Sequence, residues 1–298
     1  MRVFVTGATG FIGSAIVQEL IGAGHQVLGL ARSDAAANLL VAAGAGVHRG
    51  DLEDLDSLRS GAAAADGVIH TGFIHDFARF AEVCETDRRA IEALGSSLVG
   101  SDRPLIVCSG TLLITPGRLA TEQDIPATSC THPRVASESA ADAVTAQGVR
   151  VSVIRLSPSV HGEGDHGFVP MLINIAREKG VSAYIGDGLN RWPAVHRLDA
   201  ARLFRLALEK APDGGTRFHG VAEEGVAFRK IAEVIGKRLN IPVVGKSIEE
   251  AAAHFTWFTH FAAIDGPASS RQTQESLGWH PTQAGLIADI DSDGYFSV

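Results

Sequence analysis

The sequence predicts an α/β protein: a doubly wound parallel sheet with a small C-terminal lobe. Three observations lead to this prediction. Short β-branched runs alternate with alanine-rich helical stretches in the first half of the 298 residues, which is the pattern of successive βαβ units. Several strand candidates are almost wholly apolar, as strands buried on both faces are. A glycine-rich turn, residues 6–13, stands between the first strand and the first helix.

The first half is expected to contain six strands separated by five helices. The strands cover Arg2–Thr6, Gln26–Leu30, Gly46–His48, Gly67–His70, Pro104–Cys108 and Arg150–Leu156. The helices cover Phe11–Ala23, Ala35–Ala43, Leu55–Ala63, Phe77–Val99 and Arg134–Ala146. Each helix is long enough to connect two parallel strands across one face of the sheet.

Beyond Ser157 the alternation becomes irregular, which predicts a smaller lobe. In this part of the chain, helices are expected at Val169–Lys179, Ala200–Lys210, Ala227–Leu239 and Ile248–Phe261, and short strands at Ala183–Ile185, Thr216–Gly220 and Pro242–Val244. We assign residues 1–157 and about 186–221 to the sheet domain, and residues 158–185 and 222–298 to the lobe. The last dozen residues are expected to form a poorly ordered or docked tail.

Composition excludes several classes of partner. A formal charge of −8 and an isoelectric point of about 5.8 argue against nucleic acid and anionic membranes. Three cysteines without CxxC spacing predict no disulfide framework, and the sequence shows neither a signal peptide nor a long apolar run. A cytoplasmic protein is therefore expected. The spacing of His161 and His166 predicts no metal site.

The turn reads Thr6-Gly7-Ala8-Thr9-Gly10-Phe11-Ile12-Gly13. Glycines let backbone N–H groups approach a pyrophosphate closely, and the following helix adds the positive end of its dipole. The GxxGxxG spacing differs from the GxGxxG of the usual dinucleotide loop. Its position between the first strand and the first helix nevertheless predicts a dinucleotide site.

This turn resembles the TGxxGxxG loop of the short-chain dehydrogenase/reductase superfamily, in its extended NAD-dependent epimerase/dehydratase-like branch. Further matches follow in order at Gly50-Asp51-Leu52, Val68-Ile69-His70, Arg155–Gly162 and Trp192–Asp199. The resemblance covers essentially the whole chain. It implies a Rossmann-type fold, a nicotinamide dinucleotide and a substrate-binding C-terminal lobe.

The second strand predicts NADP(H), with NAD as the other option. It ends in Arg32 and Ser33, which can bind a 2′-phosphate, whereas Asp34 sits where a helix cap is expected. Asp51 and Leu52 resemble the pair that borders the adenine, although Asp51 can also cap the next helix. The remaining cofactor-binding residues expected from the resemblance are Gly7, Thr9, Gly10, Phe11, Ile12, Gly13, His70, Thr71, Gly72, Leu156 and Ser159.

The superfamily's Tyr-x-x-x-Lys pair is absent, because residues 1–178 contain neither a tyrosine nor a lysine. Arg134 takes the tyrosine position and Glu138 the lysine position, and their i, i+4 spacing predicts that they pair. Arginine cannot act as a general acid near neutral pH, but it can hold an oxyanion. We therefore expect Arg134 to position the substrate while Glu138 holds its guanidinium.

The proton must then come from another group. Thr111 matches the superfamily's active-site Ser or Thr, with a turn-stabilising role as the alternative. His75 and His161 are the candidate acids or bases. Residues expected to line the substrate site are Phe73, His166, Tyr184 and Trp192.

These features predict an NADP(H)-dependent oxidoreductase acting on a small carbonyl or alcohol. Two alternatives stay open: an epimerase or dehydratase with no net redox change, and a non-catalytic dinucleotide sensor. The small side chains of the helices at Phe77–Val99 and Arg134–Ala146 predict a homodimer, since superfamily relatives assemble through this pair.

Overall fold

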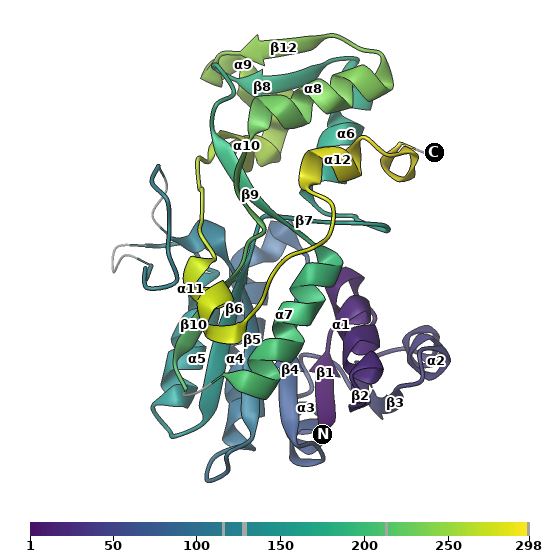
Figure 1. Ribbon diagram of the computed structural model, residues 1–298, viewed down its shortest axis with the longest axis vertical. Coiled ribbons are helices and arrows are strands. Elements are labelled where there is room, and N and C mark those ends of the chain that lie inside the picture. Colours follow the sequence, from purple (N-terminus) through teal and green to yellow (C-terminus); the bar gives the residue numbers. More distant parts are fainter. Residues whose placement is uncertain (115–116, 127–129, 212–213, 297–298) are drawn as a thin grey trace.

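The computed structural model describes residues 1–114, 117–126, 130–211 and 214–296. A parallel sheet flanked by helices forms one end of the molecule, and a smaller lobe lies beyond the carboxyl ends of its strands (Figure 1). The α/β fold class is therefore confirmed.

The central sheet has seven strands in the order β10-β6-β5-β4-β1-β2-β3, and every pairing is parallel. They are β1 (Arg2–Thr6), β2 (Gln26–Ala31), β3 (Gly46–Arg49), β4 (Gly67–His70), β5 (Pro104–Gly110), β6 (Arg150–Leu156) and β10 (Thr216–Gly220). The order reverses between β1 and β4. Ligands of doubly wound folds bind at such a reversal, beyond the carboxyl ends of the strands.

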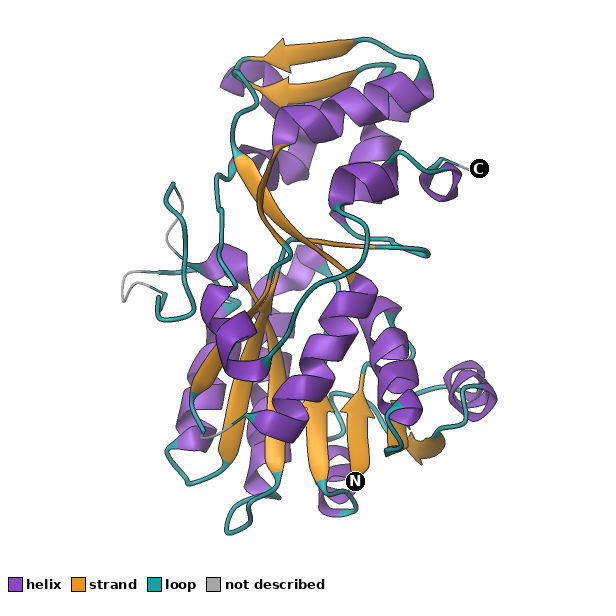
Figure 2. Ribbon diagram, in the orientation of Figure 1, coloured by secondary structure: helices purple, strands orange, loops and turns teal. Residues whose placement is uncertain are grey.

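Helices cover both faces of the sheet, as Figure 2 shows. One apolar core packs α1 (Phe11–Gly22), α2 (Asp34–Ala42) and α7 (Arg197–Lys210) against the sheet. A second apolar core packs α3 (Leu55–Ala63), α4 (Phe80–Ser96) and α5 (Val135–Thr145) against the sheet. A one-turn 3₁₀ helix, η1 (Phe77–Arg79), precedes α4, and another, η2 (Thr111–Leu113), follows β5.

The lobe is built around a third core. Its helices are α6 (Phe168–Lys179), α8 (Phe228–Leu239), α9 (Ile248–Phe255), α10 (Thr259–Ala263) and α12 (Leu286–Ile290). Its strands β7 (Ser159–His161), β9 (Arg191–His196) and β11 (Glu223–Ala227) form one small sheet, and β8 (Ser182–Ile185) with β12 (Val243–Lys246) forms another. None of β7, β9 and β11 is evident from the sequence, because their short, mixed polar segments lack a clear period of two.

One expected helix is broken. The stretch Ile248–Phe261 divides into α9, the 3₁₀ turn η3 (Thr256–Phe258) and α10. The break occurs at Thr256, whose φ is +52° and ψ −124°. This backbone conformation is incompatible with a continuous helix.

The C-terminal segment returns to the sheet before it reaches the lobe. After α11 (Arg271–Leu277), Trp279 is buried in the core that packs α1, α2 and α7 against the sheet, and its indole N–H donates to Asp199 O at 2.9 Å. The Asp199 carboxylate in turn accepts the backbone N–H groups of Thr282 and Gln283. The assignment of residues 222–298 to the lobe is thus wrong for this segment. The expected tail is docked through η4 (Asp293–Tyr295), and residues 297–298 lie outside the described part.

Across the described ranges, no helix combines the length and apolar character that a membrane span requires.

Candidate active site

The glycine turn links β1 to α1 with little free space around two of its three glycines. Gly7 has a φ of +67°, and a Cβ there would lie 2.7 Å from Gly72 N. A Cβ on Gly13 would lie 2.0 Å from Gly7 O. Gly10 differs, because its Cβ would meet only Gly7 O, at 3.2 Å. The fold itself therefore requires Gly7 and Gly13, while a side chain at Gly10 would meet a single tight backbone neighbour.

The start of α1 has the properties of an anion site. Its N-cap is Gly10, no side chain in the described residues caps it, and its first turn contains no acidic residue. Backbone N–H groups at such an end carry partial positive charge and need an acceptor. Thr9, Phe11 and Ile12, all expected to contact the cofactor, lie in this turn. The residues present fit the pyrophosphate of a nicotinamide dinucleotide.

The end of β2 differs in one detail from the expectation. Ser33, not Asp34, is the N-cap of α2: its backbone is extended and its hydroxyl accepts Ala36 N–H at 3.2 Å. Asp34 is the first helical residue, and its carboxylate accepts from Arg49 Nη2 at 2.5 Å. The expected role of Asp34 as the cap is therefore wrong. Arg32 is exposed, and within the described residues its side chain has no bonded partner.

Residues expected around the adenine also line this edge. The Asp51 carboxylate accepts the N–H groups of Glu53 at 2.8 Å and Asp54 at 3.0 Å, while Asp54 itself caps α3. Leu52 lies beside Gly72, because a Cβ on that glycine would be 3.0 Å from Leu52 Cδ2. The Thr71 hydroxyl donates to Thr6 O at 2.9 Å.

Two expected cofactor residues follow β6. Leu156 is buried, and Ser159 is buried with a hydroxyl that has no partner in the described residues. An unsatisfied buried hydroxyl is costly in a folded protein unless a ligand or water completes its bonding. Contact of both residues with the cofactor stays a prediction.

A buried network surrounds Asp87 of α4. One carboxylate oxygen contacts His70 Nε2 at 3.0 Å, and the other accepts from Ser137 Oγ at 2.6 Å and Arg134 Nη1 at 2.5 Å. Thr6 Oγ1 lies 2.7 Å from His70 Nδ1 and accepts Gly72 N–H. Both His70 nitrogens are thus engaged by protein groups. The His70 ring is therefore bound by the protein itself, and contact of this residue with the cofactor stays a prediction.

The charges in this network compensate one another. Burial alone would raise the pKa of Asp87, but Arg134 and the hydrogen bonds from His70 and Ser137 outweigh it and hold the pKa at about 2. Arg134 also donates to Cys108 O at 3.1 Å and lies 4.2 Å from the centroid of the Phe73 ring. Arg134 therefore fastens the start of α5 to β5 and α4.

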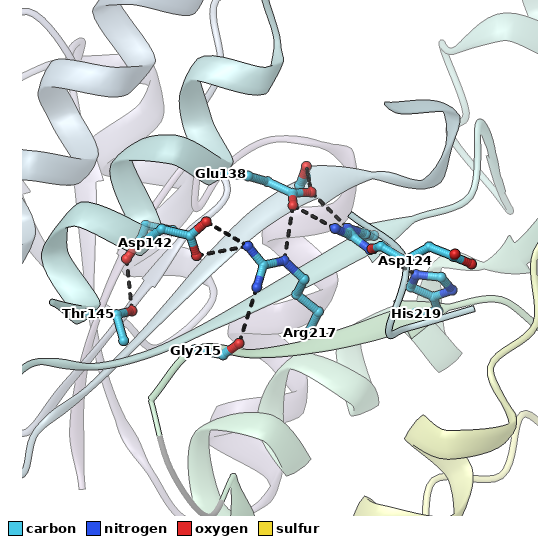
Figure 3. Close-up of polar contacts among 10 residues, drawn as sticks. Asp124, Glu138, Asp142, Thr145, Gly215, Arg217 and His219 are labelled. Carbon is cyan, nitrogen blue, oxygen red and sulfur yellow. Dashed lines mark hydrogen bonds and ion pairs between the residues drawn. The ribbon is translucent and has the colours of Figure 1, made fainter. Parts of the chain in front are cut away.

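Glu138 belongs to a second buried network, drawn in Figure 3. Its oxygens accept from Arg155 Nε at 2.8 Å and Nη2 at 2.7 Å, from Ser109 Oγ at 2.8 Å and from Arg217 Nε at 3.2 Å. Burial opposes ionisation, but these partners, Arg155 first, lower the pKa of Glu138. The expected Arg134–Glu138 pair is wrong, because stronger buried partners on other elements bind each residue.

The three candidates for proton transfer, Thr111, His75 and His161, differ in burial and in hydrogen bonding. Thr111 is buried at the end of β5, and its hydroxyl has no partner in the described residues. His75 as a whole is exposed. Its ring is partly shielded from water, and this desolvation, together with the charges of His166 and Arg134, lowers the pKa of His75. His161 is buried, and its Nδ1 is 2.7 Å from Asp289 Oδ2 of α12. His161 thus binds the C-terminal segment through Nδ1, and the catalytic role expected for it stays a prediction.

Two expected substrate residues are remote from this edge. Trp192 is completely buried in the lobe, packed against Phe168, Phe228 and Phe258. Tyr184 lies on β8, at the far end of the lobe from the sheet (Figure 1), with Arg229 5.4 Å from its ring centroid. The assignment of Trp192 is wrong, because its side chain is part of the lobe's own core. Contact of Tyr184 with a substrate stays a prediction. His166 and Phe73 do lie beside the site: the His166 ring is 5.6 Å from that of Phe11.

Several site residues are not apparent from the sequence. Asp87, Arg155 and Ser137 complete the two networks, yet Asp87 is 47 positions from Arg134. An acidic residue within a predicted helix does not by itself indicate a buried site. It does so only once the structure shows a buried cationic partner. Within the described residues, no cluster of three His, Cys, Asp or Glu side chains could hold a metal ion.

Comparison with known proteins places the chain among relatives of this architecture. An uncharacterized protein of Schizosaccharomyces pombe is 54% identical over 298 residues, covering 99% of this chain and all of the relative. A 2-alkyl-3-oxoalkanoate reductase of Stenotrophomonas maltophilia is 28% identical, covering 85% of this chain and 80% of the relative.

A dTDP-glucose 4,6-dehydratase of Streptomyces venezuelae, solved with NAD bound, shares the fold. Its TM-score is 0.77 at 20% identity, with 98% of this chain and 95% of that chain covered. The sequence pattern of the NAD dependent epimerase/dehydratase family matches residues 3–219, which span the glycine turn, both buried networks and β10. Together with the resemblance carried by the motifs, this match shows that the chain belongs to the NAD dependent epimerase/dehydratase family.

Proposed function

We propose that this protein is an NADP(H)-dependent oxidoreductase that interconverts a small ketone or aldehyde and the corresponding alcohol. One observation carries the proposal: among the described residues, the start of α1 has no side-chain cap and the exposed Arg32 has no partner, and the two lie after neighbouring strands β1 and β2. The N-terminus of α1 is suited to bind a pyrophosphate, and the Arg32 guanidinium is suited to bind a 2′-phosphate.

The chain's residues support different parts of this activity. Gly7, Gly10 and Gly13 form the turn that holds the pyrophosphate, and Arg32 with Ser33 would select the 2′-phosphate. When bound, the reduced dinucleotide supplies the hydride, so that carbonyl, hydride and one proton give an alcohol. The unpartnered hydroxyl of Thr111 is suited to bond the substrate oxygen. Arg134, held by Asp87, adds positive charge nearby but keeps its proton.

His75 is the side chain best suited to hold the transferred proton. Its pKa lies below the ordinary value of about 6.5. The protonated form therefore becomes abundant only as the pH falls below that value. Carbonyl reduction should then accelerate toward acid pH, with an inflection below 6.5, and His75→Gln should flatten this profile.

The test follows NADPH absorbance at 340 nm with a panel of ketones and aldehydes, alongside equilibrium titration of NADPH and NADH. The proposal expects stoichiometric NADPH consumption and tighter binding of NADPH. Turnover of a substrate with no net change in NADPH would contradict it and support an epimerase or dehydratase. Binding without any turnover would support a dinucleotide sensor.

We also propose a homodimer located in the cytoplasm. The supporting feature is the adjacency of α4 and α5, which pack closely through small residues such as Ala90, Ala140 and Ala141. Their outer face includes the charged residues Glu85 and Arg89. Light scattering at micromolar concentration tests the dimer, and a monomer mass would contradict it.

A further inference from the structure

Five aromatic side chains form a continuous surface between the sheet domain and the lobe. We call this surface the aromatic rim; its members are Phe73, Phe77, Phe80, Trp257 and Phe261. Phe77 of η1 stacks on Trp257 of η3, with ring centroids 5.0 Å apart and planes at 29°. Phe77 and Phe80 also stack, with centroids 5.9 Å apart. Two segments more than 170 positions apart in the chain thus share one surface.

The rim begins at the candidate active site. The Arg134 guanidinium lies over the Phe73 ring, and the ring of His75 is 5.4 Å from that of Phe73. From Phe73 the contacts continue through Phe80 and Phe77 to Trp257. A substrate bound beside Arg134 and His75 can therefore extend along the rim.

Trp257 is held outward by a strained backbone. Its exposed fraction is 53%, whereas Trp192 and Trp279 are completely buried. The preceding Thr256 has a φ of +52°, a conformation that costs a β-branched residue about 1–3 kcal/mol. The Thr259 hydroxyl donates to Thr256 O at 2.7 Å and stabilises this turn. Strain of this kind is characteristic of sites where a side chain must be presented to a ligand.

The rim carries little unpaired positive charge, because the Arg134 guanidinium over Phe73 is bound to Asp87. In residues 73–80 and 254–263 the single arginine or lysine is Arg79. Asp76 and Glu82 both pair with it, at 2.9 Å and 3.1 Å. A nucleotide sugar has a diphosphate that requires cationic or backbone donors. Aromatic faces instead bind flat apolar groups by stacking.

We propose that the aromatic rim binds the apolar part of the substrate, a neutral ketone or alcohol with a planar aromatic group. This inference rests on the proposed function, since it names the substrate class of the same site. The aromatic group lies against the stacked rings of Phe77 and Trp257, and the carbonyl lies at the Phe73 end of the rim, beside His75.

The test uses 2-acetylnaphthalene as the ligand and calorimetry on the full chain saturated with NADP⁺. The expected dissociation constant is at least tenfold lower than that of UDP-glucose. Trp257→Ala should weaken binding about tenfold, as the loss of one aromatic stacking partner does. Trp257→Phe should stay within about threefold of the wild type, since it keeps an aromatic face. Ile248→Ala is the matched control, because Ile248 is also an apolar lobe residue that is 53% exposed.

The outcomes separate the inference from the proposed function. Equal binding by Trp257→Ala and Ile248→Ala, or tighter binding of UDP-glucose, would overturn the inference. A parallel titration with NADPH tests the proposed function independently. If NADPH fails to bind while 2-acetylnaphthalene binds and responds to Trp257→Ala, the proposed function fails and the rim remains a binding surface for aromatic ligands.

Discussion

The glycine turn after β1 and the two networks around Asp87 and Glu138 lie along the same edge of the sheet but differ in how their polar groups are satisfied. At the turn, no side chain in the described part of the chain caps the N-terminal amides of α1. In the networks, buried charges are fully matched: Asp87 by Arg134 and His70, and Glu138 by Arg155 and Arg217.

This difference distinguishes groups that can bind a ligand from groups that stabilise the fold. Groups without protein partners are available to a ligand, whereas bonded charges stabilise the structure that presents them. The positions that hold Tyr and Lys in the superfamily's reductases belong here to the scaffold. Matching a family motif position by position therefore finds the glycine turn between β1 and α1 but gives Glu138 the wrong partner.

The largest expected effect comes from opening the Glu138 network. Glu138→Ala leaves Arg155, which is completely buried, without its carboxylate. Loss of one partner of a buried ion pair costs about 3–5 kcal/mol, measurable by urea unfolding. Asp142→Ala is the control, because Asp142 also pairs with Arg217 but its side chain is 56% exposed; its cost should stay below about 1 kcal/mol. Equal losses would show that Glu138 is not a structural residue.

The next effect concerns ligand binding rather than stability. Gly10→Val should abolish detectable NADPH binding, or weaken it at least about 100-fold, because the side chain occupies the pyrophosphate's space. The fold should persist, since a Cβ at Gly10 contacts only Gly7 O, at 3.2 Å. Gly13→Ala should instead unfold the turn, where the Cβ would lie 2.0 Å from Gly7 O. Titration and circular dichroism of both variants make the comparison; wild-type affinity in Gly10→Val would remove the turn from the site.

The pH dependence of stability tests the Asp87 network. The folded pKa of about 2 lies below the unfolded value of about 3.9, so the carboxylate stabilises the fold above that value. The stabilisation, about 2–3 kcal/mol, disappears as the pH falls from 4 toward 2. Wild-type stability should therefore approach that of Asp87→Asn over this range, as measured by urea unfolding at each pH. A constant difference between the two proteins would contradict the assignment.

The smallest effect is expected at Arg32. Arg32→Ala should remove most of the preference for NADPH over NADH, a change of about tenfold, because it deletes a charged partner of the 2′-phosphate. Fluorescence titration of both nucleotides measures it. Arg59→Ala provides the control, because Arg59 is a surface arginine of α3 paired with Asp56. Equal affinities for the two nucleotides in the wild type would reject the assignment.

Local patterns predicted most of the sheet domain. The six strands and five helices expected before Ser157 are all present, with bounds shifted by a few residues. These elements depend on apolar periodicity and on the glycine turn, which are properties of neighbouring residues. The break at Thr256 was not predictable in this way, because nothing in the residues of α9 and η3 signals a positive φ.

The networks depend on residues far apart in the chain. An i, i+4 spacing predicted the Arg134–Glu138 pair, but local spacing gives at most a weak surface interaction. Arg155 comes from β6 and Asp87 from α4, and their partners become visible only after the sheet brings these elements together. The same limit applies to Trp192, whose burial depends on the packing of the whole lobe.

The return of Trp279 to the sheet core has a consequence for biosynthesis. The core around α1 and α7 contains residues from β1 at the start of the chain and Leu277 and Trp279 near its end. A ribosome delivers the N-terminus first, so β1–β6 emerge long before the side chains that complete their packing. The dinucleotide-binding half therefore reaches its final packing only when nearly the whole chain has been synthesised, and a nascent chain stopped before residue 277 exposes the surface that Trp279 normally covers.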